Sequence, residues 1–301
     1  MQQAAPNFRS RARSLAIRAT TLAHLDRLAF HLQTAVRADR FGLIVGVHET
    51  PESLRSQFRE QLDWVAQRFA ITSLEGFAKI WDRNSGRDGA AKPPVLFTFD
   101  DGRESNYTVA APLLESFGGR GVFFVVPRFA ECPASEALAF YRSHINPNSR
   151  PGDETWEDWK PMNPAQIADL AARGHAIGNH TMSHTRLRGL SPQNLEREIG
   201  DSAGRITEWT RKPVEAFAWT FGWDAVDAEA WNVIRRYHRF CFAPCPGAIY
   251  ADRDTPSLMW RREIEVKYSK AEYRFLYSGS VDLWWSTRRR RLRRMLRAQN
   301  G

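Results

Sequence analysis

The sequence predicts an α/β protein whose strands form a parallel sheet, arranged as in a barrel that carries its site at one end. Short apolar runs alternate with segments of helical periodicity, which is the pattern of repeated βα units. Two of these runs end in clusters of acidic or histidine residues, and the functional residues of parallel barrels follow the carboxyl ends of strands. With 301 residues, 43% of them hydrophobic, the chain fits one large α/β barrel or two ordinary domains.

Seven segments are predicted as strands because they are short, apolar and rich in β-branched or aromatic residues. The first ends at His48, the second opens with prolines and ends before a glycine turn, and the fourth leads directly into His180. The predicted strands are 41–47, 93–99, 121–127, 175–179, 215–221, 239–243 and 259–268.

The segments between them are predicted as helices from apolar spacing and capping residues. Residues 13–38 place apolar residues at three- and four-residue steps. Asn163 and Pro164 form an N-cap followed by proline at the first helical position. Residues 131–161 mix Pro, Asn and Gly with tryptophan, which predicts a long loop of functional importance. The predicted helices are 13–38, 53–69, 106–117, 164–172, 192–208 and 228–236.

Charge is distributed unevenly along the chain. The formal net charge is +9, but residues 1–40 carry seven Arg against two Asp, and residues 287–301 carry seven Arg and no acidic residue. The ends therefore hold +5 and +7, and the body between them holds −3. We expect a basic helical extension over 1–40, one domain over 41–280 and an Arg-rich tail over 281–301.

Nothing in the sequence suggests insertion into a membrane. Charged residues and histidines interrupt every apolar stretch before residue 38, so no signal peptide is expected, and no run approaches the ~18 apolar residues of a membrane span. Three cysteines form no obvious disulfide framework, which weakly favours a reducing compartment. Cys241 and Cys245 are interpreted as small apolar residues near a strand end rather than as a metal pair. We expect a cytoplasmic protein.

Two clusters point to metal-assisted hydrolysis. Asp100 and Asp101 end the second strand in Thr98-Phe-Asp-Asp-Gly102, and adjacent side chains on a strand point to opposite sides. One carboxylate can therefore bind a metal while the other faces water or substrate. His180 and His184 would share one face of a helical turn and bind the same ion. One Asp and two His leave coordination positions open, as hydrolytic sites require.

In this order the two clusters resemble the NodB-type polysaccharide deacetylases, carbohydrate esterase family 4, whose first motifs are TFDDG and H-(S/T)-x-x-H. The resemblance covers roughly residues 41–280 and implies a distorted (β/α) barrel of about seven parallel strands. It also implies that Asp100 is the general base and that Asp101, His180 and His184 hold one divalent ion. Zinc suits this donor set, and iron, cobalt and nickel also remain open.

The third family motif, R-x-P-Y-G, is represented by Ala-Trp-Thr-Phe-Gly at residues 218–222. Ala218 and Thr220 replace its Arg and Pro; related poly-N-acetylglucosamine deacetylases also carry Ala at the Arg position. The resemblance makes the backbone N–H of Phe221 the oxyanion donor, a role that does not depend on the side chain. An ordinary core strand is the alternative interpretation. Substrate contacts are expected from Trp219, Gly222 and Trp223.

The last family motif, Leu-x-His near the C-terminus, is missing. Exopolysaccharide members of the family carry that histidine near the N-terminus, after a strand, through circular permutation. His48 after the strand 41–47 resembles this arrangement, so the layout is most similar to the permuted poly-N-acetylglucosamine-type deacetylases. His48 is the expected general acid for the departing amine. A structural histidine is the alternative.

The expected activity is removal of an N-acetyl group from an amino sugar of a bacterial envelope or exopolysaccharide, or of its lipid-linked precursor. O-Deacetylation, deformylation or another amide hydrolysis, and a catalytically silent glycan- or membrane-binding relative, are the alternatives. The segment 283–297 combines tryptophan, arginine and spaced apolar residues, as in a helix lying on an anionic membrane. Nucleic-acid patches and solvated tails share this composition. We expect peripheral contact with the inner membrane face rather than nucleic-acid binding.

Overall fold

The computed structural model describes residues 41–82, 92–149, 152, 155, 159–279 and 282–297. The predicted extension 1–40, including its helix 13–38, lies outside the described residues. So does most of the Gly-, Asp- and Arg-rich segment 82–92 before the TFDDG strand, which the sequence pattern predicts as a loop.

Strands from along the whole described chain meet in one sheet. They are β1 Phe41–Val47, β2 Ala70–Ile71, β3 Pro94–Phe99, β4 Val122–Val125, β5 Ala176–Asn179, β6 Ala216–Ala218, β7 Phe240–Ala243, β8 Ile249–Tyr250, β9 Met259–Trp260 and β10 Arg262–Glu263.

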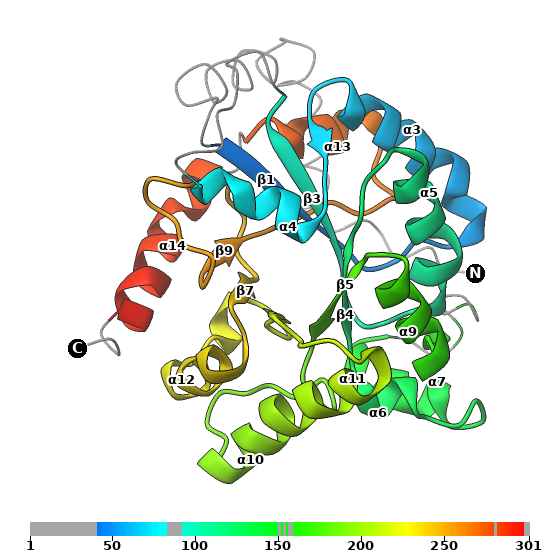
Figure 1. Cartoon of the computed structure of the whole chain (residues 1–301), viewed down its shortest axis with the longest axis vertical. Helices are drawn as coiled ribbons and strands as arrows, with labels where there is room; N and C mark the ends of the chain where they lie inside the picture. The colour runs from blue at the N-terminus through cyan, green and yellow to red at the C-terminus, as the bar shows by residue number, and fades with distance from the viewer. Residues whose placement is uncertain are drawn as a thin grey trace, which may run out of the picture.

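The sheet curls into a parallel barrel at the centre of the molecule (Figure 1). The strands β1, β3, β4, β5, β6 and β7 pair in this order, each parallel to the next. One short segment then joins the two edges, because β9 pairs with β7 while β10, after the intervening Arg261, pairs with β1. Within the described residues, the barrel therefore has seven strand positions, the seventh shared by β9 and β10, in agreement with the predicted barrel of about seven strands. In addition, β2 pairs with β3, and β8 runs antiparallel to β1.

Helices surround the barrel (Figure 1). Asn163 and Gln166 form the reciprocal hydrogen bonds of a capping box at the start of α9, where the sequence predicted a helix. The helices are η2 Glu52–Leu54, α3 Arg55–Ala66, α4 Leu74–Ala78, η3 Lys79–Trp81, η4 Asn106–Ala110, α5 Ala111–Ser116, α6 Pro127–Ala130, α7 Ala137–Phe140, η5 Tyr141–Ile145, α9 Pro164–Ala172, α10 Pro192–Glu196, η6 Arg197–Asp201, α11 Ser202–Thr210, η7 Trp223–Ala225, α12 Ala228–Tyr237, α13 Lys270–Tyr277 and α14 Asp282–Arg297.

One predicted loop and two predicted strands were wrong in detail. The expected loop 131–161 contains α7 and η5. The expected strand 215–221 is only three residues long in β6, because the chain turns away after Ala218. The expected strand 259–268 is reduced to β9 and β10.

Alternation along the strands sorts side chains between the barrel interior and the helical layer. Leu43 and Val45 of β1 belong to the same buried cluster as Phe58 of α3. Ile44 and Leu96 belong instead to a second cluster, which also contains residues of β6 and β7 and of helices such as α12. The carboxyl ends of the strands therefore open onto one rim, where His48, Asp100 and His180 follow β1, β3 and β5. Within the described residues, no helix is long and apolar enough to cross a bilayer.

Candidate active site

The two aspartates leave β3 in different directions. Thr98 hydrogen-bonds across to β1, and Asp100 continues its side of the strand. Asp101 then takes a left-handed backbone conformation, with φ of 72°, followed by Gly102 with φ of 71°. A Cβ on Gly102 would lie 3.3 Å from the Cα of Val125, so this turn requires glycine. The turn directs Asp101 toward the loop after β5.

His180 and His184 lie in an irregular loop, and the predicted helical turn was wrong. Thr181 and His184 have φ of 65° and 57°. Residues with a side chain rarely adopt positive φ, and such strain concentrates at functional sites. Among the described residues, five non-glycine residues do so, and four of them lie in the three motifs: these two, Asp101 and Phe221.

The side chain of Asn179 holds the histidine loop, residues 180–184, in place. Its Nδ2 donates to the carbonyl of Ile199 at 2.8 Å and lies 3.2 Å from Nε2 of His238. Its Oδ1 accepts from the Thr181 amide at 2.9 Å and from Ser202 Oγ at 2.7 Å. The histidine loop is thereby tied to the helical layer.

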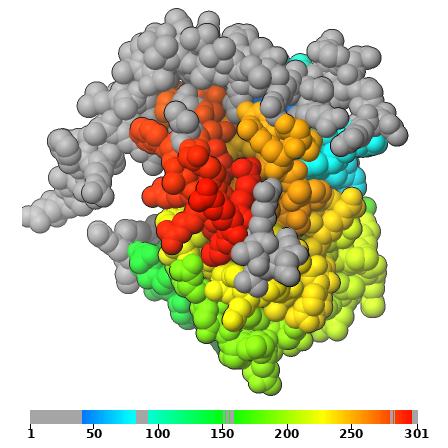
Figure 2. All heavy atoms as spheres, turned by 90° about the vertical axis from the view of Figure 1, so that its left-hand side faces the viewer, coloured from blue at the N-terminus to red at the C-terminus, as the bar shows by residue number. Residues whose placement is uncertain are grey.

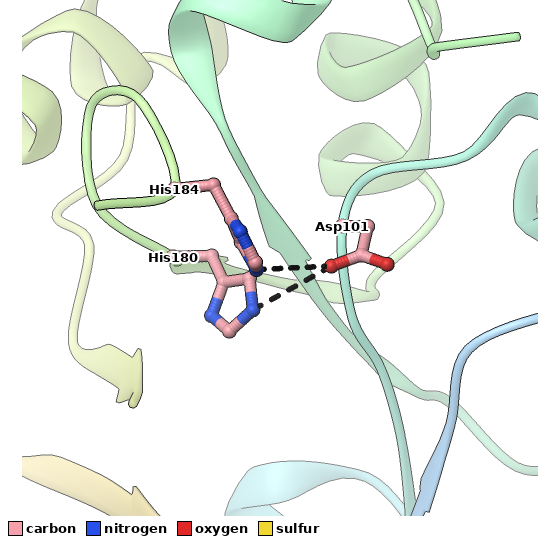
Figure 3. Close-up of side chains that lie close together, drawn as sticks. All are labelled: Asp101, His180 and His184. Atoms are coloured by element: carbon pink, nitrogen blue, oxygen red, sulfur yellow. Dashed lines mark ion pairs between the residues drawn. The ribbon is translucent and has the colours of Figure 1, made fainter. Parts of the chain in front are cut away.

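Asp101, His180 and His184 bring their ligand atoms within 4.8 Å of one another, and all three are buried (Figure 3). Oδ1 of Asp101 lies 3.7 Å from Nε2 of His180 and 3.5 Å from Nε2 of His184. Tetrahedral ligands at zinc bond lengths of ~2.1 Å lie about 3.4 Å apart, so this spacing fits one shared ion. The group could therefore hold a metal ion.

The outer nitrogens of both rings have defined partners. Nδ1 of His180 lies 2.9 Å from the carbonyl of Ala218, and Nδ1 of His184 lies 2.7 Å from that of His144. A carbonyl accepts only, so each Nδ1 carries the proton and each Nε2 offers its lone pair toward Asp101. Carbonyl partners of this kind orient histidine ligands in metal sites. The predicted loop 131–161 thus contributes to the site through His144.

The protonation states also suit a metal. Burial lowers the pKa of His180, and it lowers the pKa of His184 to about 4 despite the adjacent carboxylate. Burial opposes ionisation of Asp101, but Arg103 and the histidines hold its pKa well below the usual range. Neutral imidazoles and an ionised carboxylate are the forms that bind metal ions.

Arg103 orients the metal-facing carboxylate. Its Nη2 and Nε donate to Oδ2 of Asp101 at 3.0 and 3.3 Å, which leaves Oδ1 for the histidines. Arg103 is buried, lies 3.3 Å from Glu49 and is positioned over the ring of Tyr141.

Arg261 holds the other aspartate. Its two terminal nitrogens donate to both carboxylate oxygens of Asp100, at 2.6 and 2.8 Å, and both residues are buried. Burial raises the pKa of Asp100, but this two-point pair and the nearby histidines lower it overall. Asp100 is therefore kept ionised, as a proton acceptor must be.

His48 lies between two carboxylates. Its Nδ1 is 2.7 Å from Oε1 of Glu265, and its Nε2 is 3.8 Å from Oδ2 of Asp100. Burial disfavours the charged ring, yet Glu265 and the two aspartates together raise the pKa of His48 to about 10. His48 therefore carries a proton toward the site at neutral pH.

These groups line one cavity of about 500 Å³. Phe221 and Gly222 border it, and the ring of Phe221 packs at 4.8 Å from that of His184. Trp219 also lines it, with a buried indole N–H that has no partner within the described part of the chain. Trp223 does not line the cavity; its ring lies under the guanidinium of Arg288.

The family model for polysaccharide deacetylases matches residues 87–238, about half of the chain. The chain belongs to the polysaccharide deacetylase family. The match contains the aspartate pair, the histidine loop and the third motif of this NodB-type domain, and it confirms the resemblance found in the sequence.

Curated relatives match this deacetylase domain in part. The putative polysaccharide deacetylase YxkH of Bacillus subtilis is 28% identical over 36% of the chain and 29% of its own length. The poly-β-1,6-N-acetyl-D-glucosamine N-deacetylase of Escherichia coli K12 is 25% identical over 56% of the chain and 27% of its own length. The chain thus spans less than a third of either relative.

The fold recurs in solved structures. A de-N-acetylase from Aggregatibacter actinomycetemcomitans is similar over 78% of this chain and 99% of its own, with a TM-score of 0.60 and 14% identity. At this identity, the likeness concerns the fold alone.

Sequence reasoning missed three side chains of the site. Arg103 is next to the TFDDG motif but was not singled out. Arg261 and Glu265 lie beyond the family match, in the segment that closes the barrel. The third motif has Ala218 in place of the family's Arg, and this missing Arg was a signal that another arginine could enter the site. Arg261 supplies that guanidinium, which donates to Asp100.

Proposed function

We propose that this chain is a metal-dependent hydrolase that removes an N-acetyl group from an amino sugar of a bacterial envelope or exopolysaccharide, or of its lipid-linked precursor. The observation that carries the proposal is one cavity bordered by a three-residue metal group, an ionised Asp100 and a protonated His48. Family membership and the N-deacetylase activity for which the E. coli relative is named support the same reaction class.

Asp101, His180 and His184 would hold the ion, for which zinc is the proposed identity. When bound, a divalent ion acidifies water and polarises an amide carbonyl. The remaining steps belong to the chain: Asp100 takes a proton from the attacking water, whose oxygen adds to the acetyl carbon. The amide N–H of Phe221 is proposed to donate to the developing oxyanion.

His48 is proposed to complete the reaction. As the C–N bond breaks, its Nε2 proton passes to the departing nitrogen, so that acetate and a free amine are formed. Glu265 orients the ring through Nδ1, and Arg261 keeps Asp100 in its ionised form. The site therefore contains a separate group for each of the two proton transfers.

The test is acetate release by the metal-loaded, full-length protein. We expect release from N-acetylglucosamine oligomers, and a loss of about 10²–10⁴ in turnover for Asp100→Asn with the ion retained, because only the base is removed. Cleavage of O-acetyl sugars without any cleavage of N-acetyl sugars would replace the proposal with an esterase. Full turnover in Asp100→Asn would mean that the roles of the two aspartates are wrongly assigned. The cytoplasmic location stays a prediction.

A further inference from the structure

Helix α14 turns two different faces to its surroundings. Leu292 and Leu296 are buried against the barrel. Arg293 pairs with Asp254, and Arg289 donates to the carbonyl of Pro246. At the start of the helix, Asp282 pairs with the buried Arg262 of β10 at 2.7 Å. This face is therefore anchored, and it fixes the orientation of the opposite face.

The outward face carries arginines that are not neutralised by carboxylates: Arg288 stacks on tryptophan rings, and Arg290 donates to the hydroxyl of Thr287. Arg288, Arg290, Arg291 and Arg294 are exposed, and within the described residues no carboxylate lies within ion-pair distance of any of them. Trp284 stands at the same surface with 81% of its area exposed. Figure 2 shows α14, in red, lying along the surface. Neighbouring like charges at three- and four-residue spacing destabilise a helix, so this face favours an external anion.

This face ends beside the cavity. The guanidinium of Arg288 lies 5.2 Å from the ring of Trp223 and 4.5 Å from that of Trp285. Trp223 directly follows Gly222, which lines the cavity. The Arg288 end of this face therefore lies near a residue that adjoins the cavity lining.

We propose that the outward face of α14 docks on an anionic lipid bilayer. Arginines bind lipid phosphates, and exposed tryptophan partitions into the interfacial layer. Because its other side is packed on the barrel, α14 cannot enter the major groove of DNA as a free helix can, whereas its exposed side can lie on a planar surface. Docking would bring the cavity to the membrane surface, where a lipid-linked sugar would be presented; that consequence rests on the proposed function, whereas docking itself does not.

The experiment is co-sedimentation of the full-length protein with vesicles of phosphatidylglycerol and phosphatidylcholine, or of phosphatidylcholine alone. We expect binding only to the anionic vesicles, with release as salt is raised. The triple variant R290Q/R291Q/R294Q should bind about a hundredfold more weakly, since each basic residue contributes on the order of 1 kcal/mol and tenfold corresponds to 1.4 kcal/mol. Trp284→Ala should weaken binding in a salt-insensitive manner.

The matched control is R59Q/R197Q/R239Q, which removes the same charge from exposed arginines on α3, η6 and the segment before β7. It should bind like the wild type, and both triple variants should retain activity on soluble oligomers. An equal loss in both triple variants, or a full-length protein that ignores anionic vesicles at low salt, would overturn the proposal. So would tighter binding of duplex DNA than of vesicles through the same arginines. Vesicle binding without any deacetylation would leave this surface intact and refute the proposed function alone.

Discussion

The two walls of the cavity are built in different ways. On the metal side, Asp101, His180 and His184 come from two short motifs inside the family match, and their spacing alone suggested a shared ion. On the proton-transfer side, His48 and Glu265 lie 217 residues apart in the chain, and both fall outside that match.

This difference has a physical cause. A metal group can be formed within two loops, because each loop needs only to present ligands of the right kind. A proton donor and its orienting carboxylate can come from any two strands, because closure of the barrel brings distant parts of the chain together. We therefore expect the metal side to bind its ion independently and the other side to affect only turnover, and the predictions below test that separation.

The largest effect should follow loss of a metal ligand. His184→Ala, or His180→Ala, should leave a folded protein without its ion and reduce turnover to that of metal-stripped wild type, since no other group can replace the lost nitrogen. Metal content and circular dichroism measure the two properties. His144→Ala is the control, because it removes a nearby imidazole yet keeps the carbonyl that accepts from His184. Normal ion content in both ligand variants would refute the metal group.

His48→Ala should retain the ion and lose about 10²–10⁴ in turnover on an N-acetyl substrate, which is the usual contribution of a positioned acid. The loss on an O-acetyl ester should be smaller, because an alkoxide leaves with less need of a proton. Equal losses on the amide and the ester would exclude the role of general acid.

The pH dependence of turnover should report the protonation of His48. Glu265 helps to raise the pKa of His48, so the acid form persists into alkaline solution. Glu265→Gln should therefore move the alkaline limb of the turnover profile to lower pH, without reducing ion content. An unchanged limb would assign it to another residue.

The sequence predicted most of the barrel and the metal side because both depend on local patterns. Alternating strands and helices gave the fold class, and Asn163-Pro164 gave the start of α9. The helical turn proposed for His180 and His184 failed because spacing alone does not reveal the positive φ of Thr181 and His184. Arg261 and Glu265 were missed because their partners are defined only when β9 and β10 join the barrel edges.

Two arginines offer a matched pair of smaller effects. Arg103→Lys should lower metal affinity about 10–100-fold, because a single ammonium keeps the charge but loses the two-point hold on Asp101. Arg261→Lys should leave metal affinity unchanged. Instead, a weaker hold on Asp100 should raise the pKa of that carboxyl and move the acidic limb of the turnover profile to higher pH. Metal competition titrations and pH profiles of both variants test the separation of the walls; the same response in both would disprove it.

The smallest effect at neutral pH should come from substitution of His238. This residue lies outside the two metal-binding motifs but contacts Asn179, so the metal side also depends on a distant part of the chain. This ring sits at the end of α12 with Nδ1 3.0 Å from the carbonyl of Ile234, so its Nε2 is the acceptor for Asn179, the residue before His180. Burial lowers the pKa of His238 to about 4, and the folded protein therefore requires the neutral ring.

The contribution of His238 to the free energy of unfolding depends on pH because the pKa of this ring differs between the folded and unfolded states. The unfolded chain takes up a proton at about pH 6.5, well above the folded value, so the contribution of His238 to stability is complete above pH 6.5 and declines as pH falls toward 4. The free energy of unfolding should decline by on the order of 3 kcal/mol, because each unit of pKa difference corresponds to 1.36 kcal/mol.

His238→Gln retains a polar group near Asn179 and cannot titrate, so the free energy of unfolding of this variant should vary less with pH than that of the wild type. Denaturant titrations of both metal-loaded proteins from pH 7 to about pH 4 measure this difference. Parallel curves would show that His238 does not control acid stability, and a reduced ion content in the variant would show that the helical layer, through Asn179, also sets the position of His180.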